Sequence, residues 1–173
     1  MLYHSPVGSD HGDQILPLNL MRESFPDLHA THYAKYVGRE SALGQTIPPL
    51  SCTWGDVAFL SPVDSGLLFD ALRQSGRSFP SLPFCTLDAS VLDPDRTCIR
   101  LMRKFLTGPE AEPASGDDFL TFTTATLRAV SRVTHAALER PRNLTAHELM
   151  LPWVDLPHIL HRGPVPIALL RKP

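Results

Sequence analysis

The density of proline is the sequence feature that most limits what this chain can fold into. The chain carries 17 prolines among 173 residues. Each proline fixes its own φ angle, removes an amide hydrogen and disfavours helix at the preceding residue. We therefore expect short secondary-structure elements, joined by ordered connections that do not repeat along the sequence.

Composition is typical of a globular protein with one hydrophobic core. Hydrophobic residues make up 43% of the sequence, and the mean hydropathy is -0.06. This length suits a single domain over residues 1–173. A net charge of -2 argues against a non-specific nucleic-acid or membrane surface, although basic clusters at 96–104 and 161–172 leave a local patch open.

Targeting signals and cysteine usage indicate where such a protein works. No segment has the pattern of a signal peptide or the apolar length of a transmembrane span. The three cysteines are odd in number and lack CxxC spacing, which is typical of reduced thiols. We expect a cytoplasmic protein without a membrane partner.

Apolar patterning and turn residues predict an α+β fold with a modest mixed sheet and two or three helices. The predicted strands cover residues 2–4, 56–61, 82–87 and 97–102. The predicted helices cover 27–43, 64 or 65–75, and 115 or 117 to about 140. Residues 108–118 are expected to form a polar loop, and residues 144–151 and 164–170 to form extended pieces near the end.

The chain opens with a short apolar strand that ends in Tyr-His. Leu2-Tyr3-His4-Ser5 is followed by a Gly-Asp-x-Leu-x-Pro-like turn over residues 12–17. This segment resembles the first motif of the rifampicin ADP-ribosyltransferases and, more loosely, that of the tRNA 2′-phosphotransferases. The resemblance implies that His4 holds the nicotinamide ribose of NAD and that Ser5 lies beside it. Ser5-Pro6 stands where the family has Gly-Thr.

A second block is similar to the family strand that leads directly into a helix. Asp56-Val57-Ala58-Phe59-Leu60-Ser61 precedes the helix predicted from residue 64 or 65. The resemblance implies that Phe59 stacks on the nicotinamide and that Ser61 lines the site. Phe59 as an ordinary core residue is an equally good interpretation of the same pattern.

Three carboxylates are candidates for the catalytic acid. Asp93 and Asp95 lie in a turn that matches an acidic turn of the family, and Glu148 lies in a segment similar to the catalytic Glu strand of DNA-modifying ADP-ribosyltransferases. A carboxylate there would stabilise the oxocarbenium-like ribose as nicotinamide leaves, or activate the acceptor. As alternatives, the aspartates form a polar turn and the glutamate lies at a surface edge.

Together these blocks imply a small, mainly antiparallel split sheet of the ADP-ribosyltransferase type. The implied activity is a glycosyltransferase reaction that moves ADP-ribose from the cofactor NAD to an acceptor. The acceptor is open between a small molecule, a protein and a nucleic acid. Tyr33 and Tyr36 are expected to bind the cofactor, and together with Trp54 and Trp153 they are expected to line a pocket.

Histidine spacing supports a competing hypothesis, a metal-dependent hydrolase. His29 and His32 are three residues apart, as are His158 and His161, and His147 lies nearby in the sequence. Three such ligands with an open position would suit zinc or iron. Since no HExxH motif is present, we assign no metal ligand.

Two further interpretations stay open. Each of the three cysteines is either a nucleophile beside a histidine or a small packed hydrophobe; they are Cys52, Cys85 and Cys98. The irregular apolar run at 48–54 either packs over the core or shapes a pocket for a ligand. A protein that binds a small ligand without turnover is therefore the third functional hypothesis.

Overall fold

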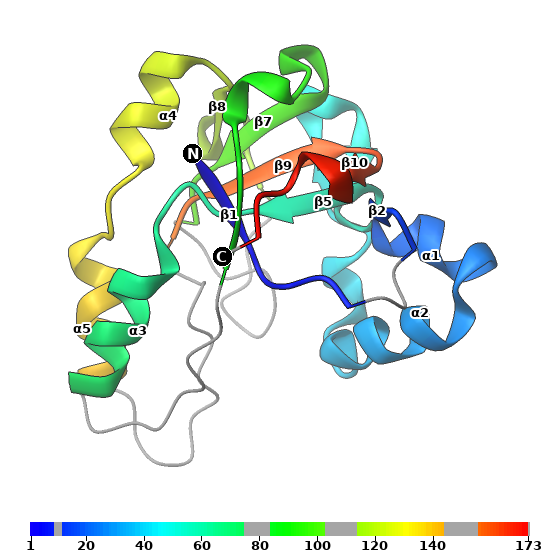
Figure 1. Ribbon diagram of the computed structural model, residues 1–173, viewed down its shortest axis with the longest axis horizontal. Helices are drawn as coiled ribbons and strands as arrows, with labels where there is room; N and C mark the ends of the chain where they lie inside the picture. Colours follow the sequence, from blue (N-terminus) through cyan, green and yellow to red (C-terminus); the bar gives the residue numbers. More distant parts are fainter. Residues whose placement is uncertain (9–11, 75–83, 103–113, 144–155, 173) are drawn as a thin grey trace.

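The computed structural model describes residues 1–8, 12–74, 84–102, 114–143 and 156–172. It has an α+β architecture with a central sheet, as Figure 1 shows. In this view α1 and α2 lie to the right of the central strands, and α3, α4 and α5 lie to the left. The coarse fold class predicted from the sequence is therefore confirmed.

The central sheet has four strands in the order β5-β9-β7-β8, and every pairing in it is antiparallel. Its strands are β5 (Val57–Leu60), β7 (Thr97–Arg100), β8 (Phe119–Thr121) and β9 (His158–Arg162). Val57 pairs with Arg162, and Thr97 pairs with His161. Strand β9, the last of these four along the chain, thus lies between β5 and β7 inside the sheet.

The other strands of the described residues form three two-stranded ladders, and all three ladders are antiparallel. They are β1–β6 (Leu2–His4 with Cys85–Leu87), β2–β10 (Gln14–Ile15 with Val165–Pro166) and β3–β4 (Thr46–Ile47 with Cys52–Thr53). Thr86 in β6 faces both Tyr3 and Arg171, so β6 lies between the two ends of the chain. The predicted mainly antiparallel character is confirmed for the described residues, but the predicted mixture with parallel pairing is not found there, because all of these pairings are antiparallel.

The described residues form five α-helices, more than the predicted two or three. They are α1 (Leu18–Ser24), α2 (Pro26–Tyr33), α3 (Ser65–Gln74), α4 (Thr124–Val130) and α5 (His135–Asn143). Short 3-10 turns cover Ala34–Tyr36, Glu40–Ala42, Pro48–Leu50, Trp54–Asp56, Ala89–Val91, Pro94–Arg96, Gly116–Asp118 and Ile167–Leu169. The shortness of these elements agrees with the proline spacing.

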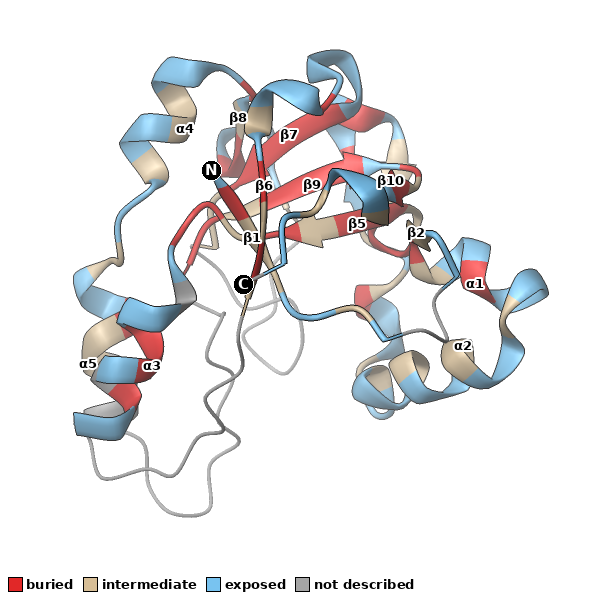
Figure 2. Cartoon of the chain, viewed as in Figure 1, coloured by how far each residue is buried: buried red, intermediate tan, exposed pale blue. Residues whose placement is uncertain are grey.

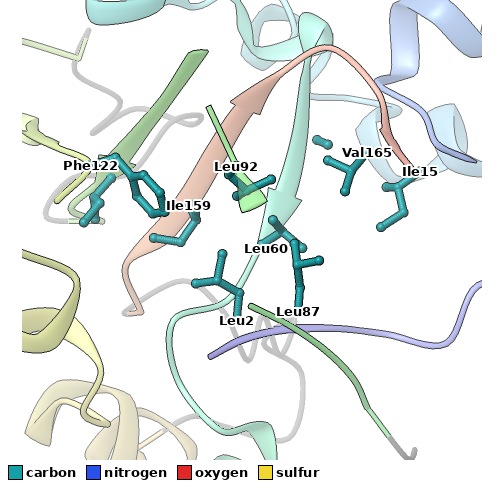
Figure 3. Packing of buried hydrophobic residues seen from close by; sticks show 10 residues of the cluster. Leu2, Ile15, Leu60, Leu87, Leu92, Phe122, Ile159 and Val165 are labelled. Atoms are coloured by element: carbon teal, nitrogen blue, oxygen red, sulfur yellow. The ribbon is translucent and has the colours of Figure 1, made fainter. Parts of the chain in front are cut away.

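The two faces of the central sheet bury two different clusters, because successive side chains of a strand point to opposite faces. On the first face, Leu60 and Ile159 pack with Leu2 and Leu87 from the β1–β6 ladder. Figure 3 shows this packing, and Figure 2 shows that burial concentrates on the strands. The second face packs apolar and aromatic side chains: Ile47, Leu50, Trp54, Val57, Cys98, Phe119 and Leu160.

Two helix predictions were wrong in extent. The predicted helix 27–43 ends as α2 at Tyr33, passes through a 3-10 turn and stops before Gly38, whose φ of 81° leaves the helical region. The predicted helix from 115 or 117 to about 140 contains β8, α4 and α5 instead. Strand β8 ends at Thr121, and Thr123 caps α4, since its hydroxyl accepts the amide hydrogen of Thr126.

Candidate functional site

The junction of β1 with the end of β5 brings two predicted site residues together. Tyr3 and Ser61 exchange both backbone hydrogen bonds, of 2.8 and 2.9 Å. His4 follows Tyr3 directly, and its ring Nδ1 donates to the carbonyl oxygen of Ser5 at 2.6 Å, which fixes a proton on Nδ1. The backbones of His4, Ser5 and Ser61 therefore lie at one corner of the fold.

The hydroxyl of Ser61 is engaged in the turn that leads to α3. It donates to the carbonyl of Val63 at 2.9 Å and accepts the Val63 amide at 3.1 Å. Asp64 then accepts the amide hydrogen of Gly66 at the start of α3. Burial raises the pKa of the neighbouring Tyr3 phenol, and the negative charge of Asp64 raises it further.

Phe59 lies on the other face of the sheet from His4. Leu2 packs on the first face with Leu60, and His4 lies two residues further along the same strand, so it shares the side of Leu2. Phe59 packs on the second face, where its ring centroid lies 4.7 Å from that of Trp54. The predicted pair of nicotinamide contacts, His4 and Phe59, is therefore not brought together.

Around Phe59 the structure assembles an aromatic cluster. The His158 ring stands edge-on to Phe59, with centroids 6.3 Å apart. The Trp54 indole Nε1 donates to the Tyr36 hydroxyl at 3.2 Å. Tyr36 and Trp54, both predicted to line a pocket, thus meet beside Phe59. Tyr33, at the end of α2, is stacked on His29, with ring centroids 5.6 Å apart.

Arg100 completes this cluster and was missed by sequence reasoning. It lies on β7, and it is only 2% exposed. Its guanidinium carbon is 4.9 Å from the Trp54 ring centroid and 5.6 Å from that of Phe119. We call Trp54, Phe59, Arg100, Phe119 and His158 the Arg100 cluster. The available signal was an arginine inside an otherwise apolar predicted strand.

The electrostatics of the Arg100 cluster disfavour added positive charge. Burial lowers the pKa of the His158 imidazole to about 4; the hydrogen bond to the Leu156 carbonyl opposes this shift, and the positive charge of Arg100 adds to it. His158 is therefore neutral at physiological pH. Burial also lowers the pKa of Arg100, while the negative charge of Asp118 acts in the opposite direction.

The predicted aspartates lie at the opposite end of the sheet from His4 and Ser61. Asp93 and Asp95 precede Thr97, which pairs with His161, and His161 in turn pairs with Ala58. Ala58 and Ser61 are three positions apart, or about 10 Å along the extended chain. Asp93 instead caps the turn before β7, where its carboxylate accepts the amide hydrogen of Asp95. Glu148 lies outside the described residues.

The histidine pairs do not form a metal site. On strand β9, His158 and His161 are three residues apart and therefore point to opposite faces. His161 interacts with the Thr97 hydroxyl at 2.9 Å, and His32 interacts with the Lys35 amine at 3.2 Å. In the described part of the chain, no group of three or more His, Cys, Asp or Glu side chains could hold a metal ion. His147 lies outside that part.

Cys52 and Cys98 do not have the character of nucleophiles. Burial raises the pKa of the Cys98 thiol to about 12. Burial, and next the charge of Asp56, raise the pKa of Cys52. Both side chains are therefore neutral thiols at physiological pH, and Cys98 packs within the second-face cluster.

Comparison of the chain with known protein families, curated proteins and solved structures finds no match in any of the three. None of the helices in the described ranges has the length and apolar character that a membrane crossing requires.

Proposed function

We propose that this protein binds NAD and transfers its ADP-ribose to an acceptor. The observation that supports the proposal is the β1–β5 junction, where two backbone hydrogen bonds between Tyr3 and Ser61 hold His4 beside the strand–helix turn. In the family that the sequence resembles, the first-strand histidine and the following strand contribute to one cofactor site. The junction therefore brings together the backbones at two of the positions that the resemblance implies, His4 and Ser61, while Phe59 lies on the other face.

The proposed reaction breaks the bond between nicotinamide and C1 of the ribose. Nicotinamide leaves with the bonding electrons, and an acceptor atom bonds to C1 and loses its proton to a base. His4, oriented by its hydrogen bond to Ser5, holds the ribose. Asp93 and Asp95 lie too far along the sheet to share this corner, so the proposal assigns the carboxylate role to Glu148. Phe59 has no role in it.

The acceptor stays open between a small molecule, a protein and a nucleic acid. The proposal places the reaction in the cytoplasm, where thiols stay reduced. Cys52, Cys85 and Cys98, all within the described ranges, form no disulfide.

The test is the release of nicotinamide when the purified protein is incubated with NAD. We expect release by the wild type and, at the same rate, by the control His135→Ala, whose side chain is 89% exposed on α5. We expect release at least about tenfold slower in His4→Ala, with a melting temperature within about 3 °C of the wild type.

A second variant is needed if His4→Ala has a much lower melting temperature than the wild type. His4→Asn keeps a side-chain N–H near the position of Nδ1 and can still bond to the Ser5 carbonyl. We expect this variant to fold and, like His4→Ala, to release nicotinamide much more slowly than the wild type. Full release in a folded His4→Asn protein would overturn the role of His4. The absence of both release and an NAD-induced thermal shift in the wild type would overturn the proposed function.

A further inference from the structure

Two of the three cysteines meet in the cluster on the second face of the central sheet. Cys98, on β7, is a member of that cluster and is only 2% exposed. Cys52, on β4, is half-buried and packs against the same cluster. Cys85 lies elsewhere, on β6 in the β1–β6 ladder, where it pairs with His4. The tertiary structure therefore brings together two thiols that are far apart in the sequence.

The β3–β4 ladder is held against the part of the sheet that contains Cys98. Cys98 pairs with Leu160 on β9, and Arg162 points to the same face as Leu160 because it lies two residues further along that strand. Arg162 donates from Nη1 to the carbonyl oxygen of Leu50 at 3.2 Å. Leu50 ends the 3-10 turn between β3 and β4, and this turn also contacts β7. Cys52, two residues after Leu50, is thus placed over the face to which Cys98 points.

The electrostatics of the two thiols agree with this placement. Burial raises the pKa of Cys98 to about 12, and a negative charge on Cys52 raises it further, whereas Arg100 opposes the shift. Such an interaction between charges weakens with distance, so it is expected for neighbouring side chains. Both thiols are free in the structure. Because neither thiol is activated, what the fold supplies for a reaction between them is proximity.

We propose that Cys52 and Cys98 form a disulfide when a peroxide oxidises the protein, and that this bond ties the β3–β4 ladder to the central sheet. The half-buried Cys52 reacts first: its thiolate attacks one oxygen of hydrogen peroxide, which gives a sulfenic acid and one water. The sulfur of Cys98 then attacks the sulfur of Cys52. Hydroxide leaves and takes the Cys98 proton as a second water. The two thiols lose two electrons, and the peroxide gains them.

The disulfide would stabilise the protein because it would close a long loop of the unfolded chain. The loop from residue 52 to residue 98 includes β5, α3 and β6. A cross-link across a loop of this size removes conformational entropy from the unfolded state. We therefore expect the melting temperature of the oxidised protein to exceed that of the reduced protein by at least about 5 °C. A thiol reductant should reverse this difference.

The test treats the reduced, purified protein with hydrogen peroxide and follows its intact mass. We expect a monomer lighter by about 2 Da, since two thiol hydrogens are lost. The reaction should be faster at alkaline than at neutral pH, because the thiolate is the attacking form. Trypsin, which cleaves after arginine and lysine, places Cys52 in the peptide Glu40–Arg73 and Cys98 in the peptide Thr97–Arg100. A digest without reductant should contain these two peptides joined.

The decisive variant is Cys52→Ala, because this side chain is half-buried and its loss should leave the fold intact. We expect this variant to form no internal disulfide and to gain no thermal stability from peroxide. Cys98→Ala should behave in the same way, and Cys52→Ala decides the question if Cys98→Ala, which removes a buried side chain, does not fold. Cys85→Ala is the matched control and should form the same linkage as the wild type.

Four outcomes would overturn the proposal. They are an unchanged mass after peroxide treatment, a linked peptide that contains Cys85, a mass loss of about 2 Da that persists in Cys52→Ala, and oxidation to sulfinic acid without any linked peptide. A disulfide that leaves the melting temperature unchanged would contradict the claim that the bond ties the β3–β4 ladder to the sheet. None of these results depends on NAD turnover.

Discussion

Among single residues, His158 couples the protonation state of the protein to its stability. The ring is packed beside Phe59, and its Nδ1 donates to the Leu156 carbonyl at 2.9 Å. Burial lowers its pKa in the folded state to about 4, against an ordinary value of 6.5. Between these two values the unfolded chain binds the proton and the folded chain does not, so stability rises with pH across this window.

We predict that the free energy of unfolding falls by about 2 to 3 kcal/mol as the pH is lowered from 7 to 4, through His158 alone. Urea titrations at several pH values measure this slope. His158→Asn keeps the donor to Leu156 but does not titrate, so its slope should be shallower. His161, whose pKa is also lowered by burial, contributes the same sign, so some slope remains.

The matched control is His135→Asn, at an exposed position on α5. Its free energy of unfolding should depend on pH in the same way as that of the wild type. A wild-type slope in the His158→Asn protein would contradict the assignment of the acid sensitivity to this imidazole.

A local sequence pattern can reveal some residues of the candidate site but not others. His4 is recognisable because a histidine at the end of a short apolar strand is a local pattern. Arg100 is not recognisable in this way, because its unusual state depends on Trp54 and Phe119, which come from other parts of the chain. Burial and missing partners are properties of the surroundings rather than of the residue.

Among the elements, α3 shows how an apolar stripe determines packing. The helix packs against α5, and its inner side chains join Val63 and Leu156 in a third buried cluster. Leu68 is completely buried there, whereas its neighbour Leu67 is 59% exposed. Adjacent helix positions point about 100° apart, so one leucine enters the core and the other remains in solvent.

We predict that Leu68→Ala lowers the free energy of unfolding by about 3 kcal/mol, because it leaves a cavity in the cluster between α3 and α5. Leu67→Ala should change it by less than about 0.5 kcal/mol. The two changes remove the same atoms from the same helix, so chemical denaturation of both isolates the effect of burial. Equal destabilisation by the two would contradict the orientation of α3.

The sequence predicted a helix or strand correctly where turn or capping residues mark both of its ends. The strand expected at 56–61 is β5, and the helix expected from residue 64 or 65 is α3, with Asp64 accepting an amide hydrogen in its first turn. The prediction failed over residues 115–140, where apolar residues at helical spacing hid β8. The pairing of β8 with β7 outweighed that local preference, as tertiary context often does.

At the scale of the whole molecule, stability is distributed unevenly. Strand β9 is bonded on both sides, to β5 and to β7, and Ile159 and Leu160 within it are fully buried. Helix α2 contains no buried residue. Segments with few buried contacts open locally without unfolding the rest of a protein.

We predict that the amides of Ile159 and Leu160 exchange with solvent deuterium only on global unfolding. The amides of α2 should exchange through local opening, with a protection free energy lower by at least about 2 kcal/mol. Native-state hydrogen exchange, followed residue by residue, measures both. Equal protection in α2 and β9 would show that α2 belongs to the same cooperative unit as the sheet.

The sequence by itself determined the α+β class and those short helices and strands whose ends are set by neighbouring turn and capping residues. Strand β1, strand β5 and helix α3 follow from apolar patterning and turn residues within a few positions. The proline spacing limited their lengths for the same local reason.

Only the tertiary structure decided which strands are neighbours and which side chains meet. Thr97 contacts His161 from 64 positions away, and such pairings depend on how whole faces are buried rather than on any local preference. This is why His4 and Phe59, adjacent in the expected site, lie on opposite faces. It is also why Arg100 is enclosed by aromatic rings without acceptors for its Nε and Nη1 in the described part of the chain.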